Sequence, residues 1–387
     1  MNAPSNRSRI DLDNWRCAPN GRWSFQNLCE IVPVATVGLR KEDDDADCRE
    51  TLEGVAVPYA DGERVPLLAH LARSEADALV VMRDGVPVGE WYAPHVDRHK
   101  PHTVFSITKS WTGMLAGIAA REHGLDPERP VSAYVALPAG SAYGKARVRD
   151  LLDMSVDIEF EDKYLDREGL FDRYRRAMLW NSDPLGTAET MAGFLRTLTS
   201  ARQAHGQRFY YASPNTDMLG LVIEGATGQR YHEYLAKRLW EPMGAKGAAY
   251  VTVDRAGTAR AAGGLCMTAR DLARFGQLVL DGGTNGAGQS VIPRAWIDDM
   301  RTRGSRQAWT DGNFNDMFTD KGSYRSCWYS TGNGRGAFCA IGIHGQWLWV
   351  DPTSRLVTVR LSSRAAVSDD AASSREIAMM EAISRAL

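Results

Sequence analysis

The sequence predicts an α+β protein in which an antiparallel sheet flanked by helices is built from both ends of the chain, with a block of helices inserted between them. Two observations carry this prediction. Segments of β type occur near both ends of the 387-residue chain, whereas residues 126–254 show several helical patterns and no clear strand pairs. We therefore expect an α/β lobe made of residues 1–125 and 255–387, and an inserted all-helical lobe at residues 126–254.

The N-terminal part of the predicted α/β lobe begins with an irregular arm, residues 1–50. Two apolar runs farther along flank Asp84-Gly85, a dipeptide that is a strong hairpin signal between β-type segments. From Ser106 onward the sequence SITKSWTGMLAGIAAREHG has the small and apolar residues of a buried helix, and Gly124 is a suitable C-terminal cap. A hairpin followed by a helix is therefore expected before residue 125.

The C-terminal part of the chain changes back to β character. Three consecutive antiparallel strands are expected in GAFCAIGI, GQWLWVDP and SRLVTVRLSS, with Asp351-Pro352 marking one turn. The tail SSREIAMMEAISRAL is typical of a closing amphipathic helix. We expect these strands and the N-terminal hairpin to belong to the same lobe.

Composition excludes several classes of protein. Hydrophobic residues make up 44% of the chain and Lys+Arg number 46 against 48 Asp+Glu, so no broad charge favours nucleic acid or anionic membrane. The first residues lack the apolar core of a signal peptide, and no run approaches a membrane span. Six scattered cysteines without an export signal indicate free thiols. The expected location is the cytoplasm.

The first candidate for chemistry is the tetrad Ser106-Ile107-Thr108-Lys109 at the start of the predicted helix. Residues three apart share one helix face, so Lys109 would lie one turn from Ser106. A Ser hydroxyl needs a neighbouring base to become a nucleophile, and a buried Lys with a lowered pKa supplies one. The helix N-terminus also offers backbone N–H groups to an oxyanion. The alternative is a Ser cap beside an exposed Lys.

The second candidate is Tyr211, in the segment FYYASPNTD that precedes another helical pattern. A Tyr at this point can move protons if a nearby Lys cation lowers its pKa. The alternative is a structural Tyr beside a Ser or Asn helix cap.

The third candidate is the segment Gly342-Ile343-His344-Gly345-Gln346 within the C-terminal strands. Glycine in a strand often marks a close approach of the backbone to a ligand, and a strand edge there can offer a backbone N–H to an oxyanion. The alternative is a bend in the strand. His344 is weighed as a base, but Lys109 already supplies one, so a supporting or substrate-side role is favoured.

These three motifs, in this order, resemble the class C β-lactamase superfamily, which also contains family VIII carboxylesterases, serine DD-peptidases and 6-aminohexanoate-dimer hydrolases. Residues 261–283 and 342–352 also match its pattern, and the resemblance covers roughly residues 75–385. The phrases YYASPNTDMLG and GIHGQ are most similar to the 6-aminohexanoate-dimer hydrolase branch. The resemblance implies a β-lactamase/transpeptidase-like fold.

The resemblance also implies roles for individual residues. Ser106 would be the acylated nucleophile, Lys109 its general base or the group that tunes Tyr211, and Tyr211 the donor of a proton to the leaving group. The backbone N–H groups of Ser106 and Ile343 would form the oxyanion hole. The implied substrate-binding residues are Tyr164, which would close over the substrate, Ser213, which stands where class C β-lactamases have Asn, and His344.

Two departures from the superfamily pattern bear on the substrate. Ala340-Ile341-Gly342 replaces the Lys-Thr-Gly triad of β-lactamases, which removes a cation expected to hold a substrate carboxylate. The segment 166–180 carries Arg173, Arg175 and Arg176, whereas an ammonium-bearing substrate would favour carboxylates, for which Asp166 and Asp172 are the candidates. The first departure argues against strong β-lactamase activity, and the second argues against 6-aminohexanoate itself as the substrate.

No cofactor or metal is expected. His95, His99 and His102 have a spacing that suits a metal only on a helix, and the neighbouring Pro94 and Pro101 favour a loop. The chain has no phosphate loop and no dinucleotide fingerprint. The expected partner is a small ester or amide, with neither nucleic acid nor membrane, and the sequence leaves a homodimer open.

The predicted function is hydrolysis of small linear amides or carboxylic esters through an acyl-enzyme, similar to that of 6-aminohexanoate-dimer hydrolases. Two alternatives remain. One is a family VIII-type carboxylesterase with no amide role, and the other is a catalytically silent acyl-binding protein of the same fold. Covalent labelling by a fluorophosphonate separates the enzymes from the binding protein.

Overall fold

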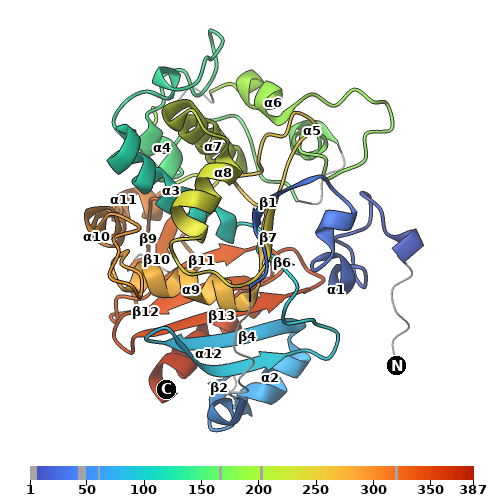
Figure 1. The fold of residues 1–387 in the computed structure, drawn as a ribbon, viewed down its shortest axis with the longest axis vertical. Helices are drawn as coiled ribbons and strands as arrows, with labels where there is room; N and C mark the ends of the chain where they lie inside the picture. The colour runs from blue at the N-terminus through green and yellow to red at the C-terminus, as the bar shows by residue number, and fades with distance from the viewer. Residues whose placement is uncertain (1–6, 42–48, 60–61, 165–167, 201–203, 319–320) are drawn as a thin grey trace.

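The computed structural model describes residues 7–41, 49–59, 62–164, 168–200, 204–318 and 321–387, and within them the strands form three antiparallel sheets (Figure 1). The largest has seven strands in the order β5-β4-β13-β12-β11-β10-β9. Its strands are β4 (Ala76–Arg83), β5 (Val86–Tyr92), β9 (Ser323–Arg325), β10 (Trp328–Ser330), β11 (Phe338–Gly342), β12 (Gln346–Asp351) and β13 (Leu356–Ser362). The expected contribution of both chain ends to one antiparallel sheet is confirmed.

The hairpin of β4 and β5 turns at the dipeptide that the sequence indicated. Asp84 and Gly85 both have positive φ, 49° and 81°, as a tight two-residue hairpin turn requires. Strand β4 then pairs along its other edge with β13, and this pairing joins the two ends of the chain. Residues 332–336 form the loop between β10 and β11.

A second sheet has the order β1-β7-β8-β6, with β1 (Val34–Gly38), β6 (His102–Thr103), β7 (Ala249–Thr252) and β8 (Leu265–Met267). Two details differ from expectation. The N-terminal arm is not irregular throughout, because it supplies β1, and the segment 126–254 contains a strand, β7. These two strands pair with each other, and runs of only four or five residues give little sequence signal before their partner is known. The division into two lobes stays a prediction.

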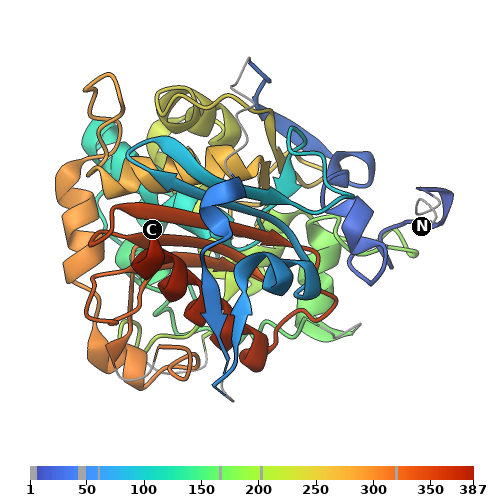
Figure 2. The same cartoon turned by 90° about the horizontal axis from the view of Figure 1, so that it is seen from below.

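Helices occur on both faces of the large sheet (Figures 1 and 2). Helix α9 packs on β4, β12 and β13, whereas α2 and α12 lie on the opposite side, beside the small sheet of β2 (Ala56–Pro58) and β3 (Arg64–Pro66). The helices are α1 (Gly21–Ser24), α2 (Leu67–Arg73), α3 (Ile107–His123), α4 (Val148–Leu152), α5 (Gly169–Ala177), α6 (Met191–Thr197), α7 (Ser213–Thr227), α8 (Tyr231–Leu235), α9 (Ala269–Leu280), α10 (Arg294–Thr302), α11 (Arg306–Thr310) and α12 (Asp370–Ala386).

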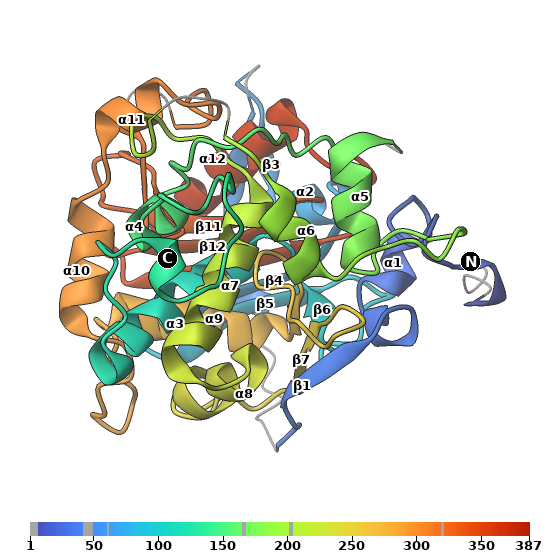
Figure 3. The same ribbon diagram turned by 90° about the horizontal axis from the view of Figure 1, so that it is seen from above.

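Helix α3 is buried along most of its length and packs against α7, beside which it lies in Figure 3. The predicted helix after Ser106 and its cap are confirmed, since α3 ends at His123 and is capped by Gly124, which has φ 68°. Glycine is required within this helix at Gly113, where a Cβ atom would lie 2.3 Å from the carbonyl oxygen of Ser326. The small residues of α3 thus let the turn between β9 and β10 approach its backbone.

Among the described residues, no helix has both the length and the apolar character needed to cross a bilayer. The described cysteines, Cys17, Cys29, Cys266, Cys327 and Cys339, are all unpaired, and Cys48 lies outside the described residues.

Candidate active site

Ser106 is the residue that immediately precedes α3, and its backbone already has helical angles. The residue before it, Phe105, has φ 45°, a left-handed conformation that costs energy in a non-glycine residue. Aromatic packing holds Phe105 there, because its ring stacks on Trp15 at 6.3 Å and meets Phe25 edge-on at 5.0 Å. The N-terminal arm therefore supports the turn that presents the Ser106 hydroxyl.

Lys109 lies one helical turn from Ser106, as the tetrad predicted. Its Nζ atom is 2.7 Å from Ser106 Oγ and 2.7 Å from the carbonyl oxygen of Ala262. The side chain is only 2% exposed, and burial lowers the pKa of Lys109 to about 7. At neutral pH a substantial fraction of this amine is therefore unprotonated and able to accept the proton of the Ser106 hydroxyl.

Tyr211 completes the group from the segment that leads into α7. The Ser106 side chain acts on the Tyr211 hydroxyl and opposes a rise in its pKa, and Lys109 Nζ lies 5.0 Å from the centre of the Tyr211 ring. Burial raises the pKa of Tyr211, and the nearby Asp162 raises it further. The sequence made a lowered pKa of Tyr211 a condition for proton transfer. This pKa is not lowered, because desolvation of the phenolate outweighs the effects of Ser106 and Arg260, which act to lower it.

Asp162 is a site residue that the sequence did not reveal. Ser213 Oγ donates to Asp162 Oδ2 at 2.7 Å, and the Ser213 backbone N–H donates to Oδ1 at 3.2 Å. The hydroxyl of Tyr164 donates to the same carboxylate at 3.2 Å. Burial raises the pKa of Asp162, while Lys109 and the Ser213 hydrogen bonds oppose that rise. Asp162 thus binds Ser213 and Tyr164, two of the expected substrate-binding residues, and also interacts electrostatically with Lys109.

The turn between β11 and β12 carries Ile343 and His344. A Cβ atom on Gly342 would lie 2.6 Å from the carbonyl oxygen of Val104, so this turn closely approaches the segment that leads to Ser106. Ile343 is half-buried. The geometry is compatible with the expected contribution of its backbone N–H to an oxyanion hole.

The side chain of His344 lies beneath this turn. It is 1% exposed, its ring is 5.2 Å from Phe25 and 5.3 Å from Phe105, and its Nδ1–H donates to the Arg364 carbonyl oxygen at 2.7 Å. Burial lowers the pKa of His344 to about 4, so the ring is neutral. A side chain this deeply buried is poorly placed to touch a substrate, and its contacts suit a residue that shapes the turn.

The arginines at 173–176 are engaged with neighbouring groups. Arg173 pairs with Glu189 and Arg176 with Asp172, whereas Arg175 packs on Phe171 and donates to the backbone oxygen of Tyr164. Asp172 also accepts from Asn181, and Asp166 lies outside the described residues. Pairing of this kind offsets much of the positive charge that the sequence places in this segment.

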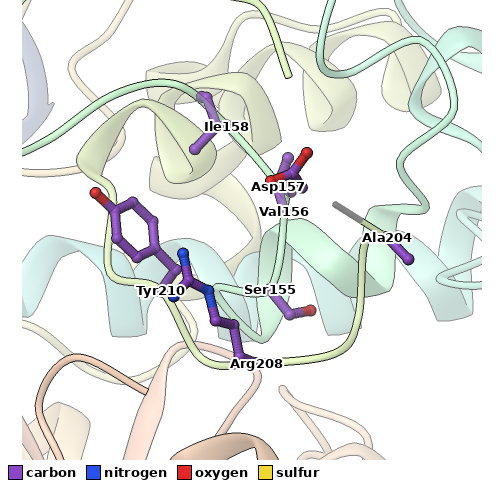
Figure 4. Close-up of a pocket in the computed structure, with 7 residues that line it drawn as sticks. All are labelled: Ser155, Val156, Asp157, Ile158, Ala204, Arg208 and Tyr210. Carbon is purple, nitrogen blue, oxygen red and sulfur yellow. The ribbon is translucent and has the colours of Figure 1, made fainter. Parts of the chain in front are cut away.

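The side chain of Tyr210 has a hydrogen-bond partner of its own. Its hydroxyl donates to the carbonyl oxygen of Phe160 at 2.8 Å. Figure 4 shows its ring beside a small recess lined by residues 155–158, Ala204, Arg208 and Tyr210. The cavity volume there is about 10 Å³, which is room for roughly one water molecule. Tyr210 is therefore a poor alternative to Tyr211 at Ser106.

The described residues contain no group of three or more His, Cys, Asp or Glu side chains that could hold a metal ion. His95 and His102 instead share the carboxylate of Asp77, with distances of 2.9 and 3.0 Å from their Nε2 atoms.

Comparison with known proteins shows the family to which the chain belongs. The family model described as Beta-lactamase matches residues 67–379. The 6-aminohexanoate-dimer hydrolase of Paenarthrobacter ureafaciens is 37% identical over 356 residues, which are 91% of this chain and 88% of that protein. A candidate 6-aminohexanoate-dimer hydrolase from Bacillus anthracis has a structure that superposes with a TM-score of 0.89 at 26% identity, covering 99% of this chain and 98% of that one.

A more distant structure shows the same fold. The D-amino acid amidase from Ochrobactrum anthropi SV3 superposes with a TM-score of 0.61 at 15% identity, over 82% of this chain and 95% of that one. The expected β-lactamase/transpeptidase-like α+β fold is thereby confirmed. The extent of the family match and the identity to the Paenarthrobacter ureafaciens enzyme show that the chain belongs to the beta-lactamase family of serine hydrolases.

Proposed function

We propose that the protein hydrolyses small linear amides or carboxylic esters through an acyl-enzyme on Ser106. The observation that carries the proposal is the 2.7 Å contact between Ser106 Oγ and the buried amine of Lys109, whose pKa is lowered to about 7. A base with a pKa near the working pH is present in its active form and still binds a proton well. The similarity to 6-aminohexanoate-dimer hydrolases favours linear amides as the substrate class.

Acylation would begin with transfer of the Ser106 hydroxyl proton to the neutral Lys109 amine. Ser106 Oγ then bonds to the carbonyl carbon, and the carbonyl oxygen becomes an oxyanion that accepts from the backbone N–H groups of Ser106 and Ile343. Collapse breaks the bond to the leaving group. The hydroxyl of Tyr211 gives its proton to the leaving nitrogen or oxygen and regains one from the Lys109 ammonium.

Deacylation would repeat these transfers with water. A water molecule gives a proton to Lys109 and attacks the acyl carbon, and the Ser106 oxygen leaves with a proton returned from the same pair. Tyr211 suits the donor role because its raised pKa keeps it protonated. Ser213 and Tyr164, both bound to Asp162, are the proposed substrate contacts.

The proposal is tested by intact mass measurement after exposure to a fluorophosphonate. The wild-type chain should gain one adduct, and Ser106→Ala should gain none. A hydrolysis panel of p-nitrophenyl esters, the linear dimer of 6-aminohexanoate and a chromogenic cephalosporin then defines the substrate class. A wild-type chain that stays unlabelled and inert would favour an acyl-binding protein, and turnover of esters alone would favour a carboxylesterase.

The unpaired state of the five described cysteines supports a reducing compartment, and we propose the cytoplasm. Cell fractionation tests this location. The proposed assembly states are a monomer or a homodimer, which light scattering after size-exclusion chromatography distinguishes.

A further inference from the structure

Besides its contact with Ser106, the amine of Lys109 binds the backbone of one residue, Ala262. This amine donates to the Ala262 carbonyl oxygen at 2.7 Å. The N–H group of the same residue donates to Asp217 Oδ1 at 2.8 Å. Asp217 belongs to α7 and is 1% exposed, so its carboxylate lies in the interior. A single residue, Ala262, connects this carboxylate to the amine of Lys109.

The second oxygen of Asp217 is bound by two further buried side chains. Arg260 forms an ion pair with Asp217 Oδ2, and the Tyr174 hydroxyl donates to the same oxygen. Arg260 is 7% exposed and lies over the ring of Tyr174, 4.7 Å from its centre. Burial raises the pKa of Tyr174, so its hydroxyl stays protonated and acts as a donor. Together, the contacts with Ala262, Arg260 and Tyr174 fix the Asp217 carboxylate in one orientation.

The backbone that carries Ala262 is also fixed to α3. Thr112 Oγ1 donates to the Ala261 carbonyl oxygen at 2.7 Å, and the Leu265 N–H donates to Thr108 Oγ1 at 3.1 Å. Between them, Gly264 has no space for a side chain, because a Cβ atom would lie 2.5 Å from Thr252 Oγ1. The segment 261–265 therefore has little freedom to move Lys109 away from Ser106 while Asp217 holds it.

We propose that Asp217 is a positioning residue for the hydrolysis, which holds Lys109 against Ser106 through the backbone of Ala262 while Arg260 fixes the carboxylate. This inference rests on the proposed role of Lys109 as the base. Asp217 contacts neither Ser106 nor the reacting atoms in this arrangement. Its effect passes through the hydrogen bonds of Ala262 and through the charges that it and Arg260 place near the amine.

The charged and titratable groups that face Lys109 come from several elements. Asp162 and Asp217 raise its pKa, and Arg260 lowers it. Cys327, from the turn between β9 and β10, stays a neutral thiol because burial raises its pKa to about 12, and Tyr211 stays a neutral phenol. Loss of Asp217 and loss of Arg260 should therefore move the titration of Lys109 in opposite directions.

The experiment measures the rate at which a fluorophosphonate labels Ser106 as a function of pH, together with kcat and KM for a p-nitrophenyl ester. The labelling rate should rise with pH as Lys109 loses its proton, which is the acidic limb of the profile, and should then reach a plateau. Asp217→Asn should lower the rate at the plateau about tenfold or more and displace the acidic limb to lower pH. Arg260→Gln should displace that limb to higher pH by roughly half a unit or more, and Arg260→Lys should restore it toward wild type. KM should change little in each case.

Asp271 provides a matched control. It is a buried Asp that accepts from the backbone N–H groups of Lys246 and Gly247 and pairs with Arg274, at the start of α9. Asp271→Asn should lower the melting temperature without moving the acidic limb. Tyr174→Phe is a second control, because it removes one hydrogen bond to Asp217 while leaving its charge and its contact with Ala262.

Removal of one member of a buried ion pair can unfold a protein. If circular dichroism shows that Asp217→Asn is unfolded, the double variant Asp217→Asn, Arg260→Gln takes its place, because it removes both charges. Its acidic limb should lie at nearly the wild-type pH, and its labelling rate at the plateau should be low. The proposal is overturned if Asp217→Asn is folded and has the plateau rate and acidic limb of the wild type. It is also overturned if Asp271→Asn displaces the acidic limb as far as Asp217→Asn does. Full labelling in Lys109→Ala would instead overturn the proposed function itself.

Discussion

Ser106 Oγ and Lys109 Nζ lie 2.7 Å apart, at the start of α3, and only the amine is fully withdrawn from solvent. The i, i+3 spacing on a helix brings the two side chains to one face. The helix start keeps Ser106 within reach of a substrate. Lys109, one turn deeper, loses its hydration, and this loss lowers the pKa of its amine. The Ser-x-x-Lys motif thus sets both the distance between Ser106 Oγ and Lys109 Nζ and the protonation state of the Lys109 amine.

This relationship predicts the pH dependence of acylation. Lys109 must be neutral to accept the Ser106 proton, and its pKa is lowered to about 7, so the rate should rise with pH through about 7 and then level off. A Lys109 amine with its ordinary pKa would place this limb above pH 9. Stopped-flow acylation by p-nitrophenyl acetate across pH 5–9 measures the limb.

Lys109→Ala should lower kcat by about 10³-fold or more while the circular dichroism spectrum is retained. An acylation rate in wild type that stays constant from pH 5 to pH 9 would contradict the assignment of Lys109 as the base.

Tyr211→Phe tests the protonation of the leaving group. This change removes only the hydroxyl and keeps the ring that packs against Phe314 at 5.3 Å. An amide nitrogen must be protonated before it leaves, whereas p-nitrophenolate leaves unaided, so amide hydrolysis should fall at least about tenfold more than ester hydrolysis. Rates for a linear amide and a p-nitrophenyl ester are compared in the same preparation. An equal loss on both substrates would place Tyr211 in the activation of Ser106 instead.

The sequence predicted those parts of the site that depend on local patterns. Ser106 and Lys109 form one helical motif, Asp84-Gly85 forms a turn, and Gly124 forms a cap, and each of these depends on residues within a few positions of one another. The resemblance to a family then pointed to Tyr211, Ser213 and Tyr164. The structure brings Tyr211 to Ser106 and links the other two through one carboxylate.

No local pattern in the sequence pointed to Asp162 or to the buried pair of Asp217 and Arg260. A single carboxylate in a loop such as EDKYLD is indistinguishable from a solvated one until its partner Ser213, 51 residues away, is placed beside it. Trp15 is a similar case, since it packs under Phe105 across a long separation in sequence. The sign of the Tyr211 pKa shift also depends on burial, which no local pattern reports.

Gly113→Ala tests the close packing of α3 that presents the site. The added methyl group would meet the carbonyl oxygen of Ser326 at 2.3 Å, and the backbone of that turn cannot move aside freely. Overpacking of this kind costs about 1–3 kcal/mol, although Ala is the better helix former. The midpoint of urea unfolding should therefore fall. Gly54→Ala is the control, because a Cβ atom there has no neighbour within 4 Å, and an unchanged midpoint in Gly113→Ala would contradict the packing argument.

Asp162→Asn tests whether one carboxylate serves both the base and the substrate-side residues. Asp162 raises the pKa of Lys109, so its neutralisation should move the acidic limb of the acylation rate to lower pH. Ser213 and Tyr164 lose the anion to which they donate. If these two side chains contact the substrate, KM should rise as well, with kcat/KM lowered by about tenfold, or about 1.4 kcal/mol. Michaelis profiles at several pH values separate the two effects.

Glu161→Gln provides the matched control, because Glu161 is the neighbouring carboxylate but is exposed and pairs only with the exposed Lys163 in the described contacts. It should leave both KM and the limb at their wild-type values, since an ion pair in water contributes little. A displaced limb with unchanged KM in Asp162→Asn would confine Asp162 to the electrostatics of Lys109. A raised KM with an unmoved limb would confine it to the placement of Ser213 and Tyr164. An unchanged profile in both respects would remove Asp162 from the site, and Asp217 would then be the remaining buried carboxylate that raises the pKa of Lys109.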